Sequence, residues 1–181
     1  TTTAADASVQ FATGFTSIGA KLAGTSSSTV VITQLPTDTS PRASSVLALA
    51  ASYAGSRRFG LFVNKSSGLD AIIKTDLTRR KATDVVVVGP VSASLITAVS
   101  ALGIRITAFD APTPAALSVA LAGAPRAGGS LVVVSQQDVA SLALAVSLSA
   151  RTQVPLLMID GGVPSSEVSS YLMTAQPKSL T

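Results

Sequence analysis

The chain has 181 residues, of which 47% are apolar and 12% are charged, and this balance excludes a disordered chain. Because it contains no His and no Cys, zinc sites built on those ligands and Ser-His or Cys-His catalysis are excluded, while the redox compartment stays open. The net charge of +4 comes from scattered basic residues without stacking aromatics, which argues against a nucleic-acid partner.

Six short runs of apolar, often β-branched residues follow one another along the chain and predict β-strands. Continuous runs of this length are typical of strands buried on both faces, as in parallel sheets. Stretches of helical length, rich in Ala, Leu and Ser, lie between them. The strict alternation predicts an α/β protein with Rossmann-like parallel sheets and helices on both faces. The strands are expected at 29–33, 59–63, 85–89, 104–109, 131–135 and 155–159, and the helices at about 8–23, 42–56, 69–80, 91–102, 113–123, 138–150 and 163–174.

Residues near the expected helix ends fit these boundaries. Asp138 precedes an apolar helical stretch as an N-cap does, and Gly123 follows another as a C-terminal stop does. The most apolar window, "DVVVVGPVSASLITAVSALGI", is broken by Gly89-Pro90 and dotted with Ser and Thr. It therefore predicts a strand followed by a helix, with Ser92 or Ser94 near the helix start, and not a membrane span.

An internal repeat relates the two halves of the chain. The segment "VLALAASYAGSRRFGLFV" (46–63) matches "SLALAVSLSARTQVPLLM" (141–158) at an offset of 95 residues. The same offset places "KATDVV" (81–86) on "QPKSLT" (176–181). We therefore expect two α/β units, residues 1–103 and residues 104–181, the second apparently incomplete. Either the natural sequence runs on past Thr181, or the second unit ends at an edge that needs no further strand.

Basic and hydroxyl side chains near the first repeated strands are candidate ligand contacts. Lys65 and Ser66 lie in the loop "NKSSG" ahead of a helix start, which suits an anion or a sugar, although the loop also fits an ordinary strand-to-helix connection. Arg57 and Arg58 directly precede a predicted strand. They are either polymer contacts or solvated charges at a helix C-terminus, where the helix dipole favours them.

Two carboxylates follow predicted strands in the second half of the chain. Asp138 and Asp160 stand at carboxyl ends of strands, where ligand sites of α/β proteins form. Asp160-Gly161-Gly162 also fits a simple turn. The segment "GPVSAS" matches neither glycine-rich nucleotide-binding pattern, so no nucleotide cofactor is expected.

Three segments of the chain share motifs with one family. They are "QDVASLALAVSLSARTQVPLLMIDGGVPSSEVSSYL" (137–172), "VVVVGPVSASLITAVSALG" (85–103) and, more weakly, "QFATG" (10–14). Together they resemble the cell-wall-binding repeat 2 family of Gram-positive bacteria. The residues that carry the resemblance are Asp138, Ala140, Leu142 and Ala143 at a helix start, Val154-Pro155-Leu156-Leu157 in a strand, and Val88, Gly89, Val91 and Ser92.

The resemblance implies a modular Rossmann-like domain that attaches proteins noncovalently to anionic wall polymers, often with three modules packed together. The chain departs from the family pattern at four signature positions. Pro90 replaces the second Gly, and Gln10 stands where Arg is usual. Ser141 stands where a second Asp is usual, and Val46 stands at the same place in the first repeat. These departures bear on polymer binding more than on the fold, which also rests on the apolar pattern and the repeat.

We therefore expect a non-catalytic, exported protein of the cell envelope that binds an anionic cell-wall polymer without a cofactor or metal. The composition, rich in Ala and Val and poor in Lys, indicates a GC-rich genome such as that of actinobacteria. One alternative is an accessory protein-interaction subunit that docks on a membrane or envelope complex. Because a surface with little charge resists self-association weakly, the chain is also compatible with an oligomer. A further alternative is a small-ligand or enzyme domain that uses Asp138 and Asp160. The expected polymer contacts are Lys65, Ser66, Arg57, Arg58, Asp138 and Asp160.

Overall fold

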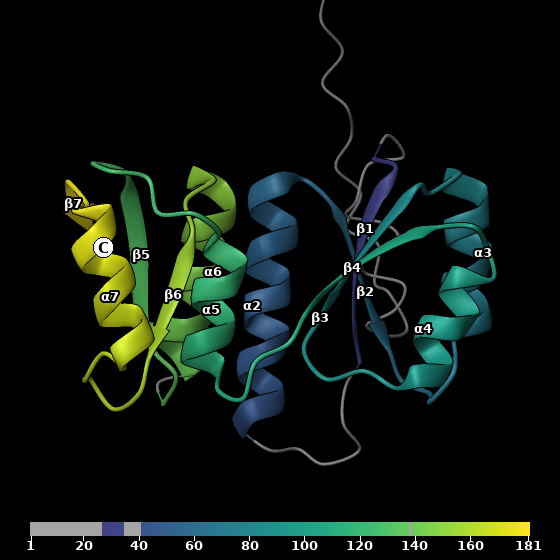
Figure 1. The fold of residues 1–181 in the computed structure, drawn as a ribbon, viewed down its shortest axis with the longest axis horizontal. Coiled ribbons are helices and arrows are strands. Elements are labelled where there is room, and N and C mark those ends of the chain that lie inside the picture. Colours follow the sequence, from purple (N-terminus) through teal and green to yellow (C-terminus); the bar gives the residue numbers. More distant parts are fainter. Residues whose placement is uncertain (1–26, 35–40, 138) are drawn as a thin grey trace, which may run out of the picture.

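A computed structural model describes residues 27–34, 41–137 and 139–181 of the chain. The helix expected at 8–23 and the N-cap expected at Asp138 lie outside the described residues. All six predicted strands are present, and helices fill the intervals between them (Figure 1). The elements are β1 (Thr29–Gln34), α2 (Pro41–Arg57), β2 (Gly60–Asn64), α3 (Ala71–Arg80), β3 (Asp84–Val88), α4 (Ala93–Ser100), β4 (Arg105–Phe109), α5 (Pro114–Ala122), β5 (Ser130–Ser135), α6 (Val139–Thr152), β6 (Leu156–Ile159), α7 (Ser166–Ala175) and β7 (Ser179–Leu180).

The strands form two parallel sheets, which confirms the predicted α/β class. The first sheet has the order β2-β1-β3-β4, and the second has the order β6-β5-β7. Every pairing within these sheets is parallel. The division of the chain at residues 103 and 104 stays a prediction; β4, which follows it in sequence, pairs with β3 in the first sheet.

The two sheets repeat one pattern of pairing. The segment 29–88 folds as β-α-β-α-β and is called the first segment below; the equivalent segment 130–180 is called the second segment. In each, the first strand lies at the centre of its three strands, between the other two. The registers correspond as well: Val31 pairs with Leu61 as Val132 pairs with Leu156, and Val30 pairs with Val85 as Leu131 pairs with Leu180.

Helix ends follow the local chemistry of the sequence. The Ser92 hydroxyl accepts a hydrogen bond from the Leu95 amide and so caps the start of α4. The Ser165 hydroxyl caps α7 in the same way by accepting from the Val168 amide. At the end of α5, Gly123 takes a φ of 74°, a conformation that glycine adopts without steric cost.

Helices cover both faces of the first sheet. Phe62 and Ile32 point to one face, where they pack in one buried cluster with Ile73 of α3 and Leu95 of α4. Val31 points to the opposite face, toward α2. The alternation along each strand therefore divides apolar side chains between two helical layers, as expected for a sheet buried on both faces.

Helices α2, α5 and α6 lie between the two sheets and join them (Figure 1). Their buried apolar side chains form one cluster with residues of both sheets, among them Val31 and Val132. Helices α2 and α6 meet at equivalent positions of the repeat: a Cβ added at Gly55 would lie 2.5 Å from the Ala150 Cβ. Beside this contact the Ser52 and Ser149 hydroxyls share a buried hydrogen bond of 2.6 Å.

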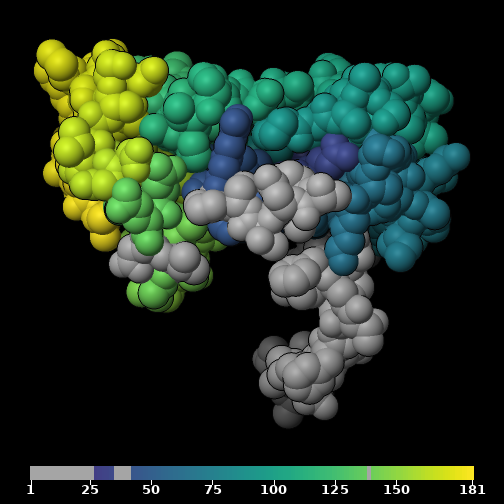
Figure 2. All heavy atoms as spheres, turned by 90° about the horizontal axis from the view of Figure 1, so that it is seen from below, coloured from purple at the N-terminus to yellow at the C-terminus, as the bar shows by residue number. Residues whose placement is uncertain are grey.

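The molecule is elongated, with α7 and β7 at one end of its long axis and α3 and α4 at the other (Figure 1). The space-filling view also shows the C-terminal elements at one end of the molecule (Figure 2). Across the described part of the chain, no helix is both long enough and apolar enough to cross a bilayer.

Candidate functional site

The loop after β2, which contains Lys65 and Ser66, is built around a buried amide. Asn64 is fully buried, and its Nδ2 donates to the carbonyls of Ser66 and Gly68, each at 2.7 Å. The Asp70 amide in turn donates to Asn64 Oδ1 at 2.9 Å. One side chain at the end of β2 therefore fixes the path of the chain into α3.

Neighbouring elements at the carboxyl end of the first sheet close the same loop. Gln34, at the end of β1, donates from Nε2 to the Ser66 carbonyl at 2.6 Å and accepts from the Ser92 amide at 2.7 Å. The Ser66 hydroxyl donates to Asp70 Oδ1 at 2.6 Å. The polar groups of this end are thus largely committed to one another, and the exposed Lys65 side chain is the main part left for a ligand.

The carboxyl end of the second sheet is simpler. Asp160 begins a turn that closes when the Val163 amide donates to the Asp160 carbonyl at 3.0 Å. Gly161 and Gly162 in this turn have φ values of 58° and 86°, which favour glycine. The Asp160 carboxylate is exposed and accepts one hydrogen bond of 3.3 Å from Gln137 Nε2. The geometry agrees with the turn interpretation of this stretch.

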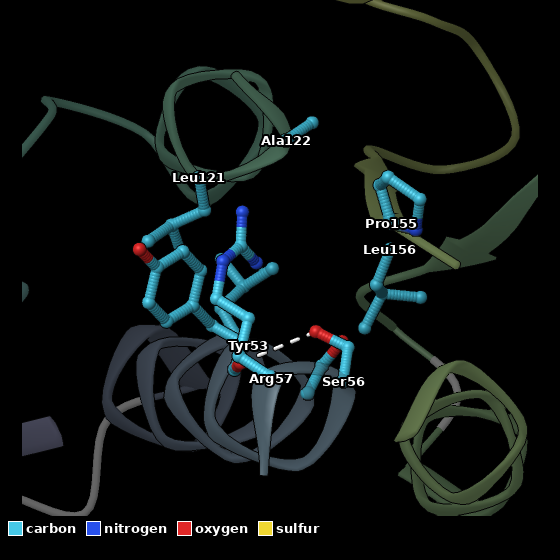
Figure 3. Close-up of a pocket in the computed structure, with 9 residues that line it drawn as sticks. Tyr53, Ser56, Arg57, Leu121, Ala122, Pro155 and Leu156 are labelled. Carbon is cyan, nitrogen blue, oxygen red and sulfur yellow. Dashed lines mark hydrogen bonds between the residues drawn. The ribbon is translucent and has the colours of Figure 1, made fainter. Parts of the chain in front are cut away.

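A hollow of about 700 Å³ lies at the opposite end of the second sheet, beside the amino ends of β5 and β6. Arg57 reaches it from the last turn of α2, Arg126 from the loop between α5 and β5, and Tyr171 from α7. Figure 3 shows a smaller pocket beside the hollow, which shares Arg57 and Pro155 with it; there the Arg57 side chain is directed from α2 toward α5, with Pro155 across from it. The complete lining is Ser56, Arg57, Ala122, Gly123, Ala124, Pro125, Arg126, Gly129, Ser130, Leu131, Gln153, Val154, Pro155, Tyr171 and Ala175.

The hollow is positively charged. Its lining contains two arginines and no Asp or Glu. In the part of the chain that the structure describes, neither Arg57 nor Arg126 forms a salt bridge. The Arg57 guanidinium lies over the Tyr53 ring, 3.9 Å from its centroid. Unpaired guanidinium groups in a concave site attract anions.

Tyr171 adds a neutral hydrogen-bonding group to the lining of the hollow. The residue is 6% exposed, and its hydroxyl has no hydrogen-bond partner among the described residues. Burial raises the pKa of Tyr171, and the nearby positive charge of Arg126 opposes this shift. The phenol is therefore protonated at neutral pH and can donate a hydrogen bond.

The structure separates the residues that the sequence predicted as one set of polymer contacts. Arg57 lines the hollow, and the adjacent Arg58 is exposed, with a φ of 57° where α2 ends. Lys65 and Ser66 follow the carboxyl end of β2, whereas Arg57 precedes its amino end. The five residues of the strand, at about 3.3 Å each, separate the two groups by about 16 Å along the sheet. Asp160 follows the far end of β6, and Asp138 lies outside the described residues.

Most residues of the hollow escaped the sequence analysis, Arg126 and Tyr171 among them. Arg126 is an isolated basic residue in the loop "GAPRAGG", and Tyr171 is one position in an amphipathic helix. Neither carries a motif. The repeat aligns Tyr171 with Asp76, a buried ion-pair residue, and this mismatch is the only signal in the sequence that the two positions differ in role.

Comparison with known proteins shows a shared fold. No family model and no curated protein matches the sequence. Among solved structures, two cell wall proteins of Clostridium difficile are similar. Cwp6 aligns with a TM-score of 0.76 and 14% sequence identity, over 89% of this chain and 26% of Cwp6. Cwp8 aligns with a TM-score of 0.69 and 14% identity, over 85% of this chain and 27% of Cwp8. This chain thus spans about a quarter of either protein.

Proposed function

We propose that this chain is a non-catalytic, extracytoplasmic module of the cell envelope that binds an anionic wall polymer. The observation that carries the proposal is the hollow beside β5 and β6, where two arginines without salt bridges face a lining free of carboxylates. The fold that the chain shares with Cwp6 and Cwp8 supports an envelope role.

The chemistry of the lining fits a polymer that carries negative charge. Arg57 and Arg126 offer planar groups that donate paired hydrogen bonds to phosphate or carboxylate oxygens. Both side chains are exposed, so their attraction to a polymer is screened by salt. Binding is therefore expected to weaken as the ionic strength rises.

Sedimentation with purified Gram-positive cell walls tests the proposal. Wild-type protein should pellet with the walls at low salt, and less of it should pellet at high salt or after extraction of the anionic polymers. The variant R57A/R126A should lose at least about tenfold in apparent affinity, the loss expected when two charge-assisted contacts disappear. Binding that persists after polymer extraction and in high salt would contradict the proposal and would point to a protein partner in the envelope.

A second pair of substitutions controls for net charge. K74A/K81A also removes two positive charges, but both side chains are exposed on α3 or directly after it, at the first sheet and away from the hollow. This variant should keep wall binding within about twofold of the wild type, since scattered surface charges contribute little individually. Equal losses in the two double variants would mean that the chain binds walls through its overall charge.

A further inference from the structure

The two equivalent segments differ most at the amino ends of their sheets. In the first segment, α3 places Asp76 and Arg80 there, 6% and 9% exposed. Arg80 Nε and a terminal nitrogen of Arg79 donate to the two oxygens of the Asp76 carboxylate. The Arg80 guanidinium also lies 5.8 Å from the centroid of the Phe62 ring. The ion pair, with the long Arg80 side chain, therefore fills the space at the amino end of the first sheet.

The repeat puts Tyr171 at the position of Asp76 and Ala175 at the position of Arg80, each 95 residues later. The backbone supports this equivalence: the Thr83 amide donates to the Ser28 carbonyl at 2.9 Å, and the Lys178 amide donates to the Gly129 carbonyl at 3.1 Å. A methyl group thus replaces the guanidinium that fills the first segment. Tyr171 and Ala175 both line the hollow of about 700 Å³ that remains.

The replacement of Asp76 and Arg80 by Tyr171 and Ala175 also changes which polar groups at this position have hydrogen-bond partners. In the first segment the carboxylate and the guanidinium satisfy each other, so nothing there calls for a ligand. In the second segment the Tyr171 hydroxyl is left without a partner in the described residues, next to the unpaired Arg126. Arg57 adds a second positive charge from outside the segment. The amino end of the sheet is therefore filled by side chains in the first segment and is an open hollow in the second segment.

We propose that the hollow holds one oxyanion-bearing, sugar-sized unit, with Arg57 and Arg126 contacting the phosphate or carboxylate group and the Tyr171 hydroxyl donating to the same unit. This inference rests on the proposed function and names its site. The volume lies within the range of roughly 300–1,000 Å³ that small-molecule sites occupy. Ser56, Ser130 and Gln153 in the lining supply the hydroxyl and amide groups that recognise sugar hydroxyls.

Titration with small probes at low salt, followed by amide NMR chemical shifts, tests this site directly. The probes are N-acetylglucosamine 1-phosphate, glucuronate and neutral N-acetylglucosamine. At least one of the two anionic probes should give saturable shifts in residues 123–131 and 153–155, and the neutral sugar should bind at least about tenfold more weakly. A stronger response to the phosphate or to the uronate identifies the anion. Equal binding of all three probes, or shifts confined to other parts of the molecule, would overturn the proposal.

The variant Y171D/A175R closes the site by design, because it copies the ion pair of the first segment into the second. It should lose at least about tenfold in affinity for the anionic probe. Since an arginine at a position that is 2% exposed can disturb folding, Y171F provides a second measurement at nearly constant shape. Y171F should weaken binding about threefold to tenfold, the effect of one lost hydrogen bond, without changing the melting temperature by more than about 2 °C. Unchanged probe affinity in Y171F would contradict the role assigned to the hydroxyl.

Wall sedimentation of the same variants separates failure of this inference from failure of the proposed function. If Y171D/A175R is folded and pellets with walls like the wild type, the hollow is not the polymer site, whereas the proposed wall binding stands. If the wild type binds the anionic probe in the hollow but does not pellet with walls, the site stands and the wall-binding function fails.

Discussion

The carboxyl end of the first sheet and the amino end of the second sheet are both rich in polar groups, yet they differ in what those groups contact. Around Asn64, side-chain and main-chain groups satisfy one another through short hydrogen bonds. In the hollow, Arg57, Arg126 and the Tyr171 hydroxyl have no salt bridge or hydrogen bond within the described residues. The hollow therefore leaves polar groups available to a ligand, whereas the groups around Asn64 are used within the protein.

Substitution of Asp76 tests whether the amino ends of the two sheets are organised differently. Replacing Asp76 by Ala leaves the buried Arg80 charge without its carboxylate, which is expected to lower the free energy of unfolding by about 3–5 kcal/mol. Urea unfolding followed by far-UV circular dichroism measures this change. Y171F, at the equivalent position, removes a hydroxyl that has no partner in the described structure and should change stability by less than about 1 kcal/mol. Similar losses in the two variants would mean that the two ends are not organised differently.

The carboxyl ends of the two sheets offer a second comparison. Asn64→Ala removes a fully buried amide that makes three hydrogen bonds, so several main-chain groups lose their partner. The free energy of unfolding should fall by about 2–3 kcal/mol. Asp160→Ala removes an exposed carboxylate with one long hydrogen bond and should stay within about 0.5 kcal/mol of the wild type. A large loss for Asp160→Ala in the same urea series would show that this turn depends on its carboxylate.

The smallest expected effect is a pH dependence that reports on the wall of the hollow. Burial raises the pKa of Tyr171 above its ordinary value of 10.0 in the folded state, with Arg126 partly opposing the rise. The unfolded chain therefore loses this proton at a lower pH than the folded protein does. The stabilising contribution is complete below pH 10 and is lost as the pH rises through 10 toward the raised pKa.

Unfolding measured at pH 8 and at pH 11 should show a larger loss of stability for the wild type than for Y171F. The difference between the two proteins isolates Tyr171 from the other groups that titrate in this range. R126A should enlarge the difference, because the opposing positive charge is gone. If the stability of the wild type and that of Y171F depended on pH in the same way, the Tyr171 phenol would be equally solvated in the folded and the unfolded state.

Much of the fold followed from local sequence patterns. The runs "TVVIT" and "LVVVS" are apolar at every central position, and such runs are stable only as strands covered on both faces. The offset of 95 residues anticipated that β3 and β7 are equivalent, and their registers on β1 and β5 agree with it, whereas β1 and β5 themselves correspond at an offset of 101 residues. Ser92 and Gly123 marked helix ends because capping depends on neighbours within a few residues.

The candidate site was much less accessible to the same reasoning. The sequence analysis selected Arg57, which lines the hollow, but it grouped Arg57 with Lys65 and Ser66, which lie at the other end of β2. Loop composition identified hydroxyls and charges in "NKSSG", and it could not say that Gln34 Nε2 would donate to the Ser66 carbonyl and the Ser92 hydroxyl to the Ser67 carbonyl. Arg126 lies 69 residues after Arg57 in the chain and carries no motif, so nothing local linked the two.

The sequence by itself determined the order of strands and helices, the parallel class of the sheets and the duplication, because burial of an apolar run depends on residues only a few positions apart. The tertiary structure alone decided which polar groups of distant segments come together. The pairing of Asp76 with Arg79 and Arg80 is local to α3, whereas Arg57, Arg126 and Tyr171 line one hollow only because the packing of α2, α5 and α7 brings distant segments together.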